Sequence, residues 1–184
     1  MAATRSLTGT ISALVNFSYI NTLDANSSGA PAYTVGNTIS TTFTSGTGAS
    51  AANRALMSLA RSLTSGNSET IDLYDLASLD IGGGAGKDGL GQSWALDGVK
   101  GFMIRNISTS VGSLVVGNDG TTACWNSFLS ASDTASFTLV PGAYMLICDP
   151  SAAGLDVTDT SNHLLKIAAS GGDLTYDIYI IGRT

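Results

Sequence analysis

The residues that would do hydrolytic chemistry are few in this chain, and none stands in a complete motif. His163 is the only histidine, and a serine or cysteine hydrolase would need it as a base beside a nucleophile and an orienting acid. Ser161, Asp159 and Asp156 lie near it in sequence, but no nucleophile-elbow pattern accompanies them. Because Leu164 begins an apolar segment, we interpret His163 as a histidine at a junction between a loop and a strand.

The carboxylates offer two further kinds of site, a glycosidase pair and a calcium loop. Glycoside hydrolysis needs two facing carboxylates. The chain has 13 Asp, and Asp72 with Asp75 is one of the pairs that could supply them. The loops 118–120 and 156–159 carry hard oxygen ligands suited to calcium, but neither matches the EF-hand pattern. Asp is also common in turns. We therefore interpret these residues as turn residues and predict no catalytic residue, no metal and no cofactor.

A glycine-rich run within residues 80–97 invites comparison with a phosphate-binding loop. A P-loop requires Gly, four residues and then Gly-Lys-Ser/Thr. Here Gly86-Lys87 is followed by Asp88, and Ile81 stands where the first glycine belongs. Both ends of the motif fail, so we predict no nucleotide site. We interpret 80–97 as a flexible loop or an arm that orders against a neighbour.

The two cysteines, Cys124 and Cys148, are too few for a disulfide scaffold. No His or Cys stands at metal-ligand spacing from them, which disfavours zinc. A bridge between the two requires their strands to be adjacent. The alternative is a pair of buried thiols in a reducing cytoplasm.

Composition limits the classes of protein to which the chain can belong. Only 12% of the residues are charged, against about 25% in a typical domain, and Lys and Glu together number 4. So few exposed helix formers argue against a helical bundle. A net charge of −6 disfavours a nucleic-acid binder. No apolar run approaches the roughly 20 residues of a membrane span, and the first residues lack the apolar core of a signal peptide.

Runs of Gly, Ser, Thr and Asn separate short apolar or alternating segments, a pattern typical of all-β domains. We expect Leu14, Phe17 and Tyr19 to point inward. The expected strands are 12–19, 37–44, 70–74, 99–107, 113–116, 135–139, 143–148, 164–168 and 175–181. We predict one all-β domain over 1–184, a jelly-roll-like β-sandwich with long Gly/Ser-rich loops. An N-terminal arm covers about 1–10, and the flexible loop covers about 80–97.

Residues 54–63 and 25–53 differ from the rest of this pattern. Residues 54–63 fit either an amphipathic helix, through Leu56, Leu59, Ala60 and Leu63, or a strand, and the periodicity alone favours the helix. Residues 25–53 contain no charged residue. A solvated loop normally carries some charge, so we interpret this absence as a sign of burial against another chain.

The C-terminal part of the chain carries a resemblance to a known family. Residues 139–157 read LVPGAYMLICDPSAAGLDV, followed by LLKIA at 164–168 and TYDIYIIG at 175–182. This order resembles a family of small tailed-phage virion proteins, whose members tend to end in "LLKIxNSG…YDIxIIG" after "PGG…APDxxGxxV". The likeness extends over about Ile39 to Gly182. Upstream residues that carry it are Asn53, Arg61, Leu63, Glu69, Asp72, Leu73, Val99, Lys100, Val115, Val116 and Gly117.

The resemblance implies a strand over Arg54 to Leu63, joined as a hairpin through residues 65–67 to the strand 70–74. It also implies a jelly-roll-like sandwich with a structural role in a phage particle. Ser58 and Leu59 replace the His-Asp that the family usually has before its arginine, so any role of those polar groups is absent here.

These expectations lead to three functional hypotheses. The leading one is a capsid decoration (cement) protein, not an enzyme, that binds the major capsid protein on the outside of the head as a homotrimer. It would be made in the bacterial host cytoplasm and would bind neither nucleic acid nor membrane. The alternative is a tail or fibre adaptor or receptor-binding component, with exposed Trp94, Trp125 or tyrosines stacking on sugars. The third is a small hydrolase using Asp pairs or His163.

Overall fold

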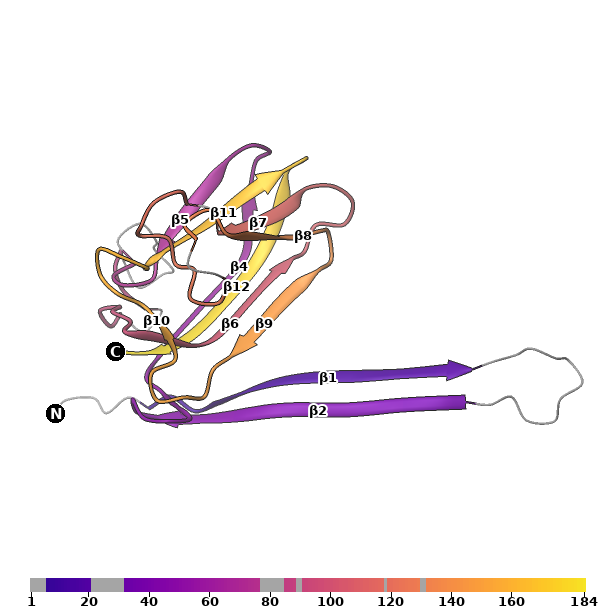
Figure 1. Cartoon of the computed structure of the whole chain (residues 1–184), viewed down its shortest axis with the longest axis horizontal. Coiled ribbons are helices and arrows are strands. Elements are labelled where there is room, and N and C mark those ends of the chain that lie inside the picture. Colours follow the sequence, from indigo (N-terminus) through magenta and orange to yellow (C-terminus); the bar gives the residue numbers. More distant parts are fainter. Residues whose placement is uncertain (1–5, 21–31, 77–84, 89–90, 118, 130–131) are drawn as a thin grey trace, which may run out of the picture.

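The computed structural model describes residues 6–20, 32–76, 85–88, 91–117, 119–129 and 132–184. Within these ranges the chain is all-β, with antiparallel sheets joined by turns. A body of two facing sheets carries one long two-stranded arm that projects from its lower edge (Figure 1). No helix long and apolar enough to cross a membrane occurs in the described ranges.

The described residues form 12 strands. They are β1 (Gly9–Ile20), β2 (Ala32–Ser45), β3 (Ala51–Ala52), β4 (Arg54–Leu63), β5 (Ser68–Asp72), β6 (Gly98–Asn106), β7 (Ser113–Gly117), β8 (Ser136–Leu139), β9 (Tyr144–Cys148), β10 (Leu155–Asp156), β11 (Leu164–Ser170) and β12 (Leu174–Arg183).

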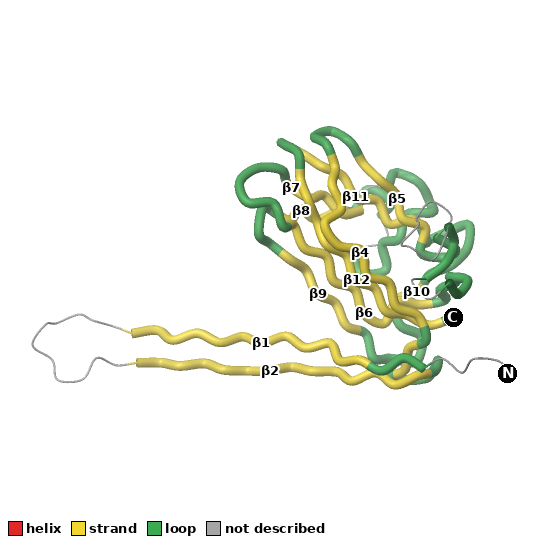
Figure 2. The backbone as a smooth tube through the Cα atoms, turned by 180° about the vertical axis from the view of Figure 1, so that it is seen from behind, coloured by secondary structure: helices red, strands yellow, loops and turns green. Residues whose placement is uncertain are grey.

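The body consists of a five-stranded and a four-stranded sheet. The first has the order β10-β6-β12-β4, with β9 beside β10 on the same edge of β6, and the second has the order β5-β11-β7-β8. All strand pairs in both sheets are antiparallel. Figure 2 shows the body from behind, with the four-stranded sheet in its upper part and the five-stranded sheet below and partly overlapping it. The body is therefore β-sandwich-like.

The core lies between these sheets and follows the alternation of the strands. In β12, Leu174, Tyr176, Ile178 and Ile180 are buried, while the residues between them are partly exposed. An aromatic cluster fills one part of the core, where the rings of Phe102 and Trp125 meet edge to face at 5.6 Å. Burial of each large apolar side chain stabilises the fold by about 1.5–3 kcal/mol.

The segment 54–63 is a strand, as the family resemblance implied, and the helical interpretation of its periodicity is wrong. β4 pairs along its length with β12, so its hydrogen bonds go to a neighbouring strand. The expected hairpin is also wrong, because β5 pairs with β11 in the other sheet. The turn at 64–67 thus carries the chain from one sheet to the other.

The arm is an antiparallel pair, β1 and β2, whose register runs from Gly9 opposite Phe43 to Ile20 opposite Ala32. The expectation that Leu14 and Phe17 point into a core is wrong, since they are 66% and 50% exposed. Ile39 on β2 is likewise exposed, whereas Phe43 at the base is fully buried. The side chain of Tyr19 lies outside the described part.

The stretch 80–97 divides into parts that the structure describes and parts that it does not. Residues 80–84 and 89–90 lie outside the described residues, as do 1–5 of the expected N-terminal arm, whose residues 9 and 10 belong to β1. Trp94 and Leu96 are buried in the core. The indole Nε1 of Trp94 donates to the backbone oxygen of Leu73 at 2.9 Å, which joins this stretch to the end of β5.

Candidate functional site

His163 stands directly before β11, at the junction where we expected it. Its ring Nδ1 lies 3.0 Å from Oδ1 of Asp72, at the end of the neighbouring strand β5. The same Asp72 oxygen accepts the backbone N–H of Tyr74 at 2.9 Å and that of Asp75 at 3.3 Å. Asp72 therefore closes a turn and holds the histidine in place, and it is not set across a cleft from Asp75.

The other acidic loop is organised by hydrogen bonds within itself. Asp156 Oδ2 accepts from the Thr158 hydroxyl at 2.7 Å, and Asn162 donates to the backbone oxygen of Asp156 at 2.9 Å. Among the described residues, no group of three or more His, Cys, Asp or Glu side chains is placed to hold a metal ion. Asn118, the first residue of the other candidate calcium loop, lies outside the described residues.

The structure also places the cysteines and the tryptophans. Cys124 is buried and Cys148 is partly exposed, and both are free thiols. Trp94 and Trp125 are 2% and 0% exposed, so the expectation that they stand free to stack on sugars is wrong. Each is held by its indole N–H, which in Trp125 donates to the backbone oxygen of Asp156 at 2.9 Å.

The arm has two chemically different faces, because successive residues of a strand point to opposite sides. We call the side of β1 and β2 that carries Ile11, Ala13, Val15, Phe17, Ile39 and Phe43 the apolar face of the arm. The opposite side, the polar face, carries mainly hydroxyl and amide side chains with Leu14 among them. Thr10 and Thr42, for example, pair across it with their hydroxyl oxygens 3.3 Å apart.

Of the described side chains on the apolar face, those at the base of the arm are the ones that pack against the body. Phe43 is fully buried there, and Ile11 packs on Gly101 of β6. Further out, Val15 is 55% exposed and Ile39 68% exposed. Neither β1 nor β2 contains a charged residue, so the two described strands of the arm present an uncharged surface.

The five-stranded sheet has an outer face that is also apolar. Tyr179 stands opposite Met57 of β4 on one side and Met103 of β6 on the other, and Met103 stands opposite Leu146 of β9. We call this line of four residues, which crosses four strands, the outer row. Met57 is 60% exposed, and the other three are partly exposed.

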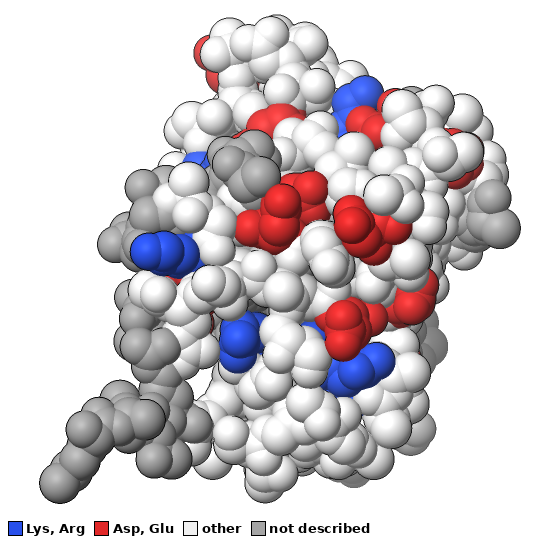
Figure 3. Space-filling model, turned by 90° about the vertical axis from the view of Figure 1, so that its left-hand side faces the viewer, with Lys and Arg blue, Asp and Glu red and all other residues white. Residues whose placement is uncertain are grey.

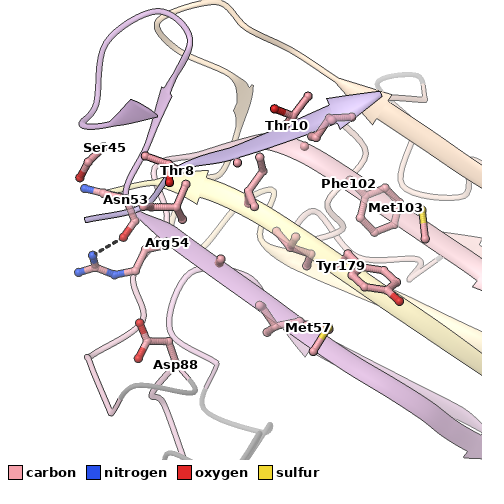
Figure 4. Close-up of a pocket in the computed structure, with 18 of the residues that line it drawn as sticks. Thr8, Thr10, Ser45, Asn53, Arg54, Met57, Asp88, Phe102, Met103 and Tyr179 are labelled. Carbon is pink, nitrogen blue, oxygen red and sulfur yellow. Dashed lines mark hydrogen bonds between the residues drawn. The ribbon is translucent and has the colours of Figure 1, made fainter. Parts of the chain in front are cut away.

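A groove of about 1200 Å³ separates the arm from this sheet. Figure 4 shows Thr8 and Thr10 of the arm side above the strands that carry Met57, Met103 and Tyr179. Of the described residues that line the groove, Arg54 and Asp88 are the charged ones. A surface of this kind binds flat, uncharged partners by excluding water from apolar side chains.

The turn at the base of the arm is fastened to the body by Lys100, which is fully buried. Its ammonium donates to the backbone oxygens of Ser151 and Ala152 and lies 3.4 Å from that of Gly48, in the turn after β2. Burial lowers the pKa of Lys100, the nearby Arg183 charge lowers it further, and Asp149 opposes both. The amide of Ser50 also donates to the oxygen of Pro150 at 2.8 Å.

A second polar cluster ties the edges of the two sheets together. Arg61 of β4 forms an ion pair with Glu69 of β5, and its Nε lies 3.1 Å from the Tyr176 hydroxyl. The Tyr176 hydroxyl itself donates to Glu69. Burial and the hydrogen bond to Glu69 raise the pKa of Tyr176 far above its ordinary value, and the bond to Glu69 raises the pKa of Arg61. These groups are occupied by one another, which suits a structural role.

Charged side chains are unevenly distributed over the end of the body. On the end of the molecule that Figure 3 shows, separate carboxylates and Lys or Arg side chains are scattered over the upper and middle part, and the lowest part shows no charged side chain. Sequence reasoning marked 25–53 as uncharged but did not find the outer row. The signal for it was the uninterrupted apolar character of 144–148 and 178–181, which is typical of strands covered on both faces.

Comparison of the chain with family models, with curated proteins and with solved structures finds no match.

Proposed function

We propose that this chain is a structural protein of a tailed-phage particle, a decoration protein that binds the major capsid protein on the outer surface of the head. The observation that carries the proposal is the arm, an uncharged ribbon with an apolar face that is exposed beyond its base. Exposed apolar surface of this extent marks a place where another chain binds, as expected of a protein that assembles in many copies on a shell. The proposal assigns no catalytic step to the chain.

We also propose that the body is a jelly roll, a fold common among viral capsid domains. Its eight main strands pair as nested partners, β4 with β12, β5 with β11, β6 with β9 and β7 with β8. When a ribbon paired in this way folds over, its strands take the orders β4-β12-β6-β9 and β5-β11-β7-β8. Apart from the two-residue strand β10, which also pairs with β6, these are the orders of the two sheets. The fold also occurs in lectins, so the body supports the proposal only together with the arm.

The family resemblance supports the same assignment, because its motifs fall on the framework of the body. The segment 164–168 lies in β11, and 175–182 lies in β12, the central strands of the two sheets. Arg61 and Glu69, two of the upstream matches, form the ion pair between the sheets. The matched residues thus serve the architecture, as expected of a virion structural family.

A decoration protein needs to recognise only the assembled shell. Binding that favours the assembled state over its separate subunits stabilises the shell by mass action. We propose that the chain acts as a homotrimer on the capsid exterior, since identical copies on a symmetric shell associate around its symmetry axes.

Counting the copies of this protein in purified particles tests the proposal. Quantitative mass spectrometry against the major capsid protein should give on the order of hundreds of copies per head, as a closed symmetric shell requires. Heads stripped of the protein should open at a lower temperature and recover on its return. A handful of copies would transfer the protein to the tail, and its absence from the particle would overturn a virion role.

A further inference from the structure

The groove and the apolar face of the arm are two uncovered apolar surfaces on one chain. We propose that the arm of one copy covers the groove of another copy. In this arrangement the arm of a second copy of this chain lies in the groove, against the outer row formed by Met57, Tyr179, Met103 and Leu146. The inference deepens the self-association in the proposed function and rests on that part of it alone, because it requires no contact with a capsid.

The arm itself requires a partner along its apolar face. A two-stranded ribbon without a packed face is at best marginally stable in water, and β1 and β2 extend well beyond the part held by the body (Figure 1). Val15, Phe17 and Ile39 stand half or more exposed on that face. Covering them stabilises the arm in proportion to the apolar area removed from water.

The groove accepts a ribbon of this kind because the arm's own base already packs beside it. Ile11 rests on Gly101, and Gly101 belongs to the line Ala55, Ile181, Gly101 and Cys148, which crosses the same four strands as the outer row. The outer row is the next outward-facing line along the sheet. A second ribbon laid on the outer row would continue the layer that Ile11 begins, with the same apolar contacts.

The occupant is another copy rather than the chain's own arm. The base of the chain's own arm is fixed by the buried side chain of Phe43. It is also fixed by two backbone hydrogen bonds, from the Thr44 amide to the oxygen of Ser50 and from the Gly46 amide to the oxygen of Ala52. Because it is held in this way, the chain's own arm forms one wall of the groove. An unrelated partner would have to supply two apolar surfaces, one for the arm and one for the groove, whereas identical copies supply both.

Charge favours the same occupant. The arm carries no charged residue in either strand, so it meets no electrostatic penalty on the outer row, where no residue is charged either. Arg54 and Asp88 line the groove, but Arg54 donates to the backbone oxygens of Asn53 and Ser93. A charged peptide would find few complementary groups here.

Disulfide trapping between two differently tagged chains tests the contact directly. One chain carries Val15→Cys in the arm, the other carries Met57→Cys in the groove, and both carry Cys148→Ser because Cys148 lies on the same outer face. Oxidation of the mixture should give a bond between the two tags. If bonds form only between chains that carry the same tag, or if none form, the proposal is overturned.

A pair of charge substitutions separates docking of the arm from its folding. Phe17→Asp places a carboxylate on the apolar face of the arm. Ser18→Asp, at the adjacent residue, places the same charge on the polar face. We expect light scattering to give an oligomer for the native chain and for Ser18→Asp, and the 18.7 kDa monomer for Phe17→Asp. Unchanged thermal unfolding of the body shows that both variants fold.

Two results would overturn the inference in this experiment, a native chain that is monomeric at tens of micromolar and a Phe17→Asp variant that remains oligomeric. Neither bears on the copy number in particles. Conversely, particles that lack the protein would remove the virion role while leaving the exchange of arms between isolated copies intact. The two proposals therefore fail by different measurements.

Discussion

Ile11 of the arm lies directly on Gly101 of the five-stranded sheet, and the contact leaves no room for a side chain at residue 101. A Cβ there would stand 2.1 Å from Cδ1 of Ile11 and 2.9 Å from Cγ1 of Ile181, closer than atoms in proteins approach one another. A larger residue at this position would therefore push the side chains of Ile11 and Ile181 aside. This contact sets where the arm leaves the body.

Gly101→Val should therefore loosen the base of the arm. Overpacking at such a contact costs about 1–3 kcal/mol, and we expect a urea midpoint lowered accordingly, with faster amide exchange at the start of β1. Gly9→Ala is the matched control, because no heavy atom lies within 4 Å of a Cβ at Gly9. Equal exchange rates in the two variants would show that Ile11 does not hold the arm.

Lys100→Met should destabilise the junction between the arm and the body. The substitution removes the hydrogen bonds from the Lys100 ammonium to the backbone oxygens of Ser151 and Ala152, and hydrogen bonds of a charged group contribute about 1.5–3 kcal/mol each. Chemical denaturation measures the loss. Lys166→Met, on the partly exposed side of β11, should change the unfolding free energy by less than about 0.5 kcal/mol. A Lys100 variant as stable as the native chain would contradict this account.

Asn106→Ala should be among the most destabilising single substitutions in the body. Asn106 is fully buried, and its amide donates to the oxygens of Gly112 at 2.8 Å and Leu139 at 3.0 Å, which joins the end of β6 to β7 and β8. Removing it orphans both carbonyls, so we expect a loss of about 2–4 kcal/mol. Thermal unfolding beside Asn37→Ala, on the exposed arm, provides the comparison.

Much of the strand framework was predictable from the sequence, because turn residues and apolar alternation are local signals. The strands expected over 113–116 and 143–148, for example, agree with β7 and β9 to within one residue at each end. The pairing partners were not predictable, since the turn after Leu63 looks the same whether β5 returns beside β4 or crosses to the other sheet. The outcome depends on the later strands, because β4 pairs with β12 in one sheet and β5 pairs with β11 in the other.

The faces of the arm were mispredicted for a simple geometric reason. Leu14 and Phe17 are three residues apart, so in a strand they point to opposite sides and cannot both face one core. The outer row escaped prediction because it depends on the register of four strands. Tyr179, Met103 and Leu146 are far apart in sequence, and hydropathy does not report which of them stand opposite each other.

The Tyr176 hydroxyl should make the protein sensitive to alkali. Because burial raises the pKa of Tyr176 above its ordinary value of 10.0, the phenol stays protonated in the folded protein while it ionises in the unfolded chain. The unfolded state then binds fewer protons, so stability falls as the pH rises above 10. Denaturant unfolding between pH 9 and about 11.5 should show a steeper loss for the native chain than for Tyr176→Phe. Parallel curves would mean that the hydroxyl ionises freely and that the cluster with Arg61 and Glu69 does not hold its proton.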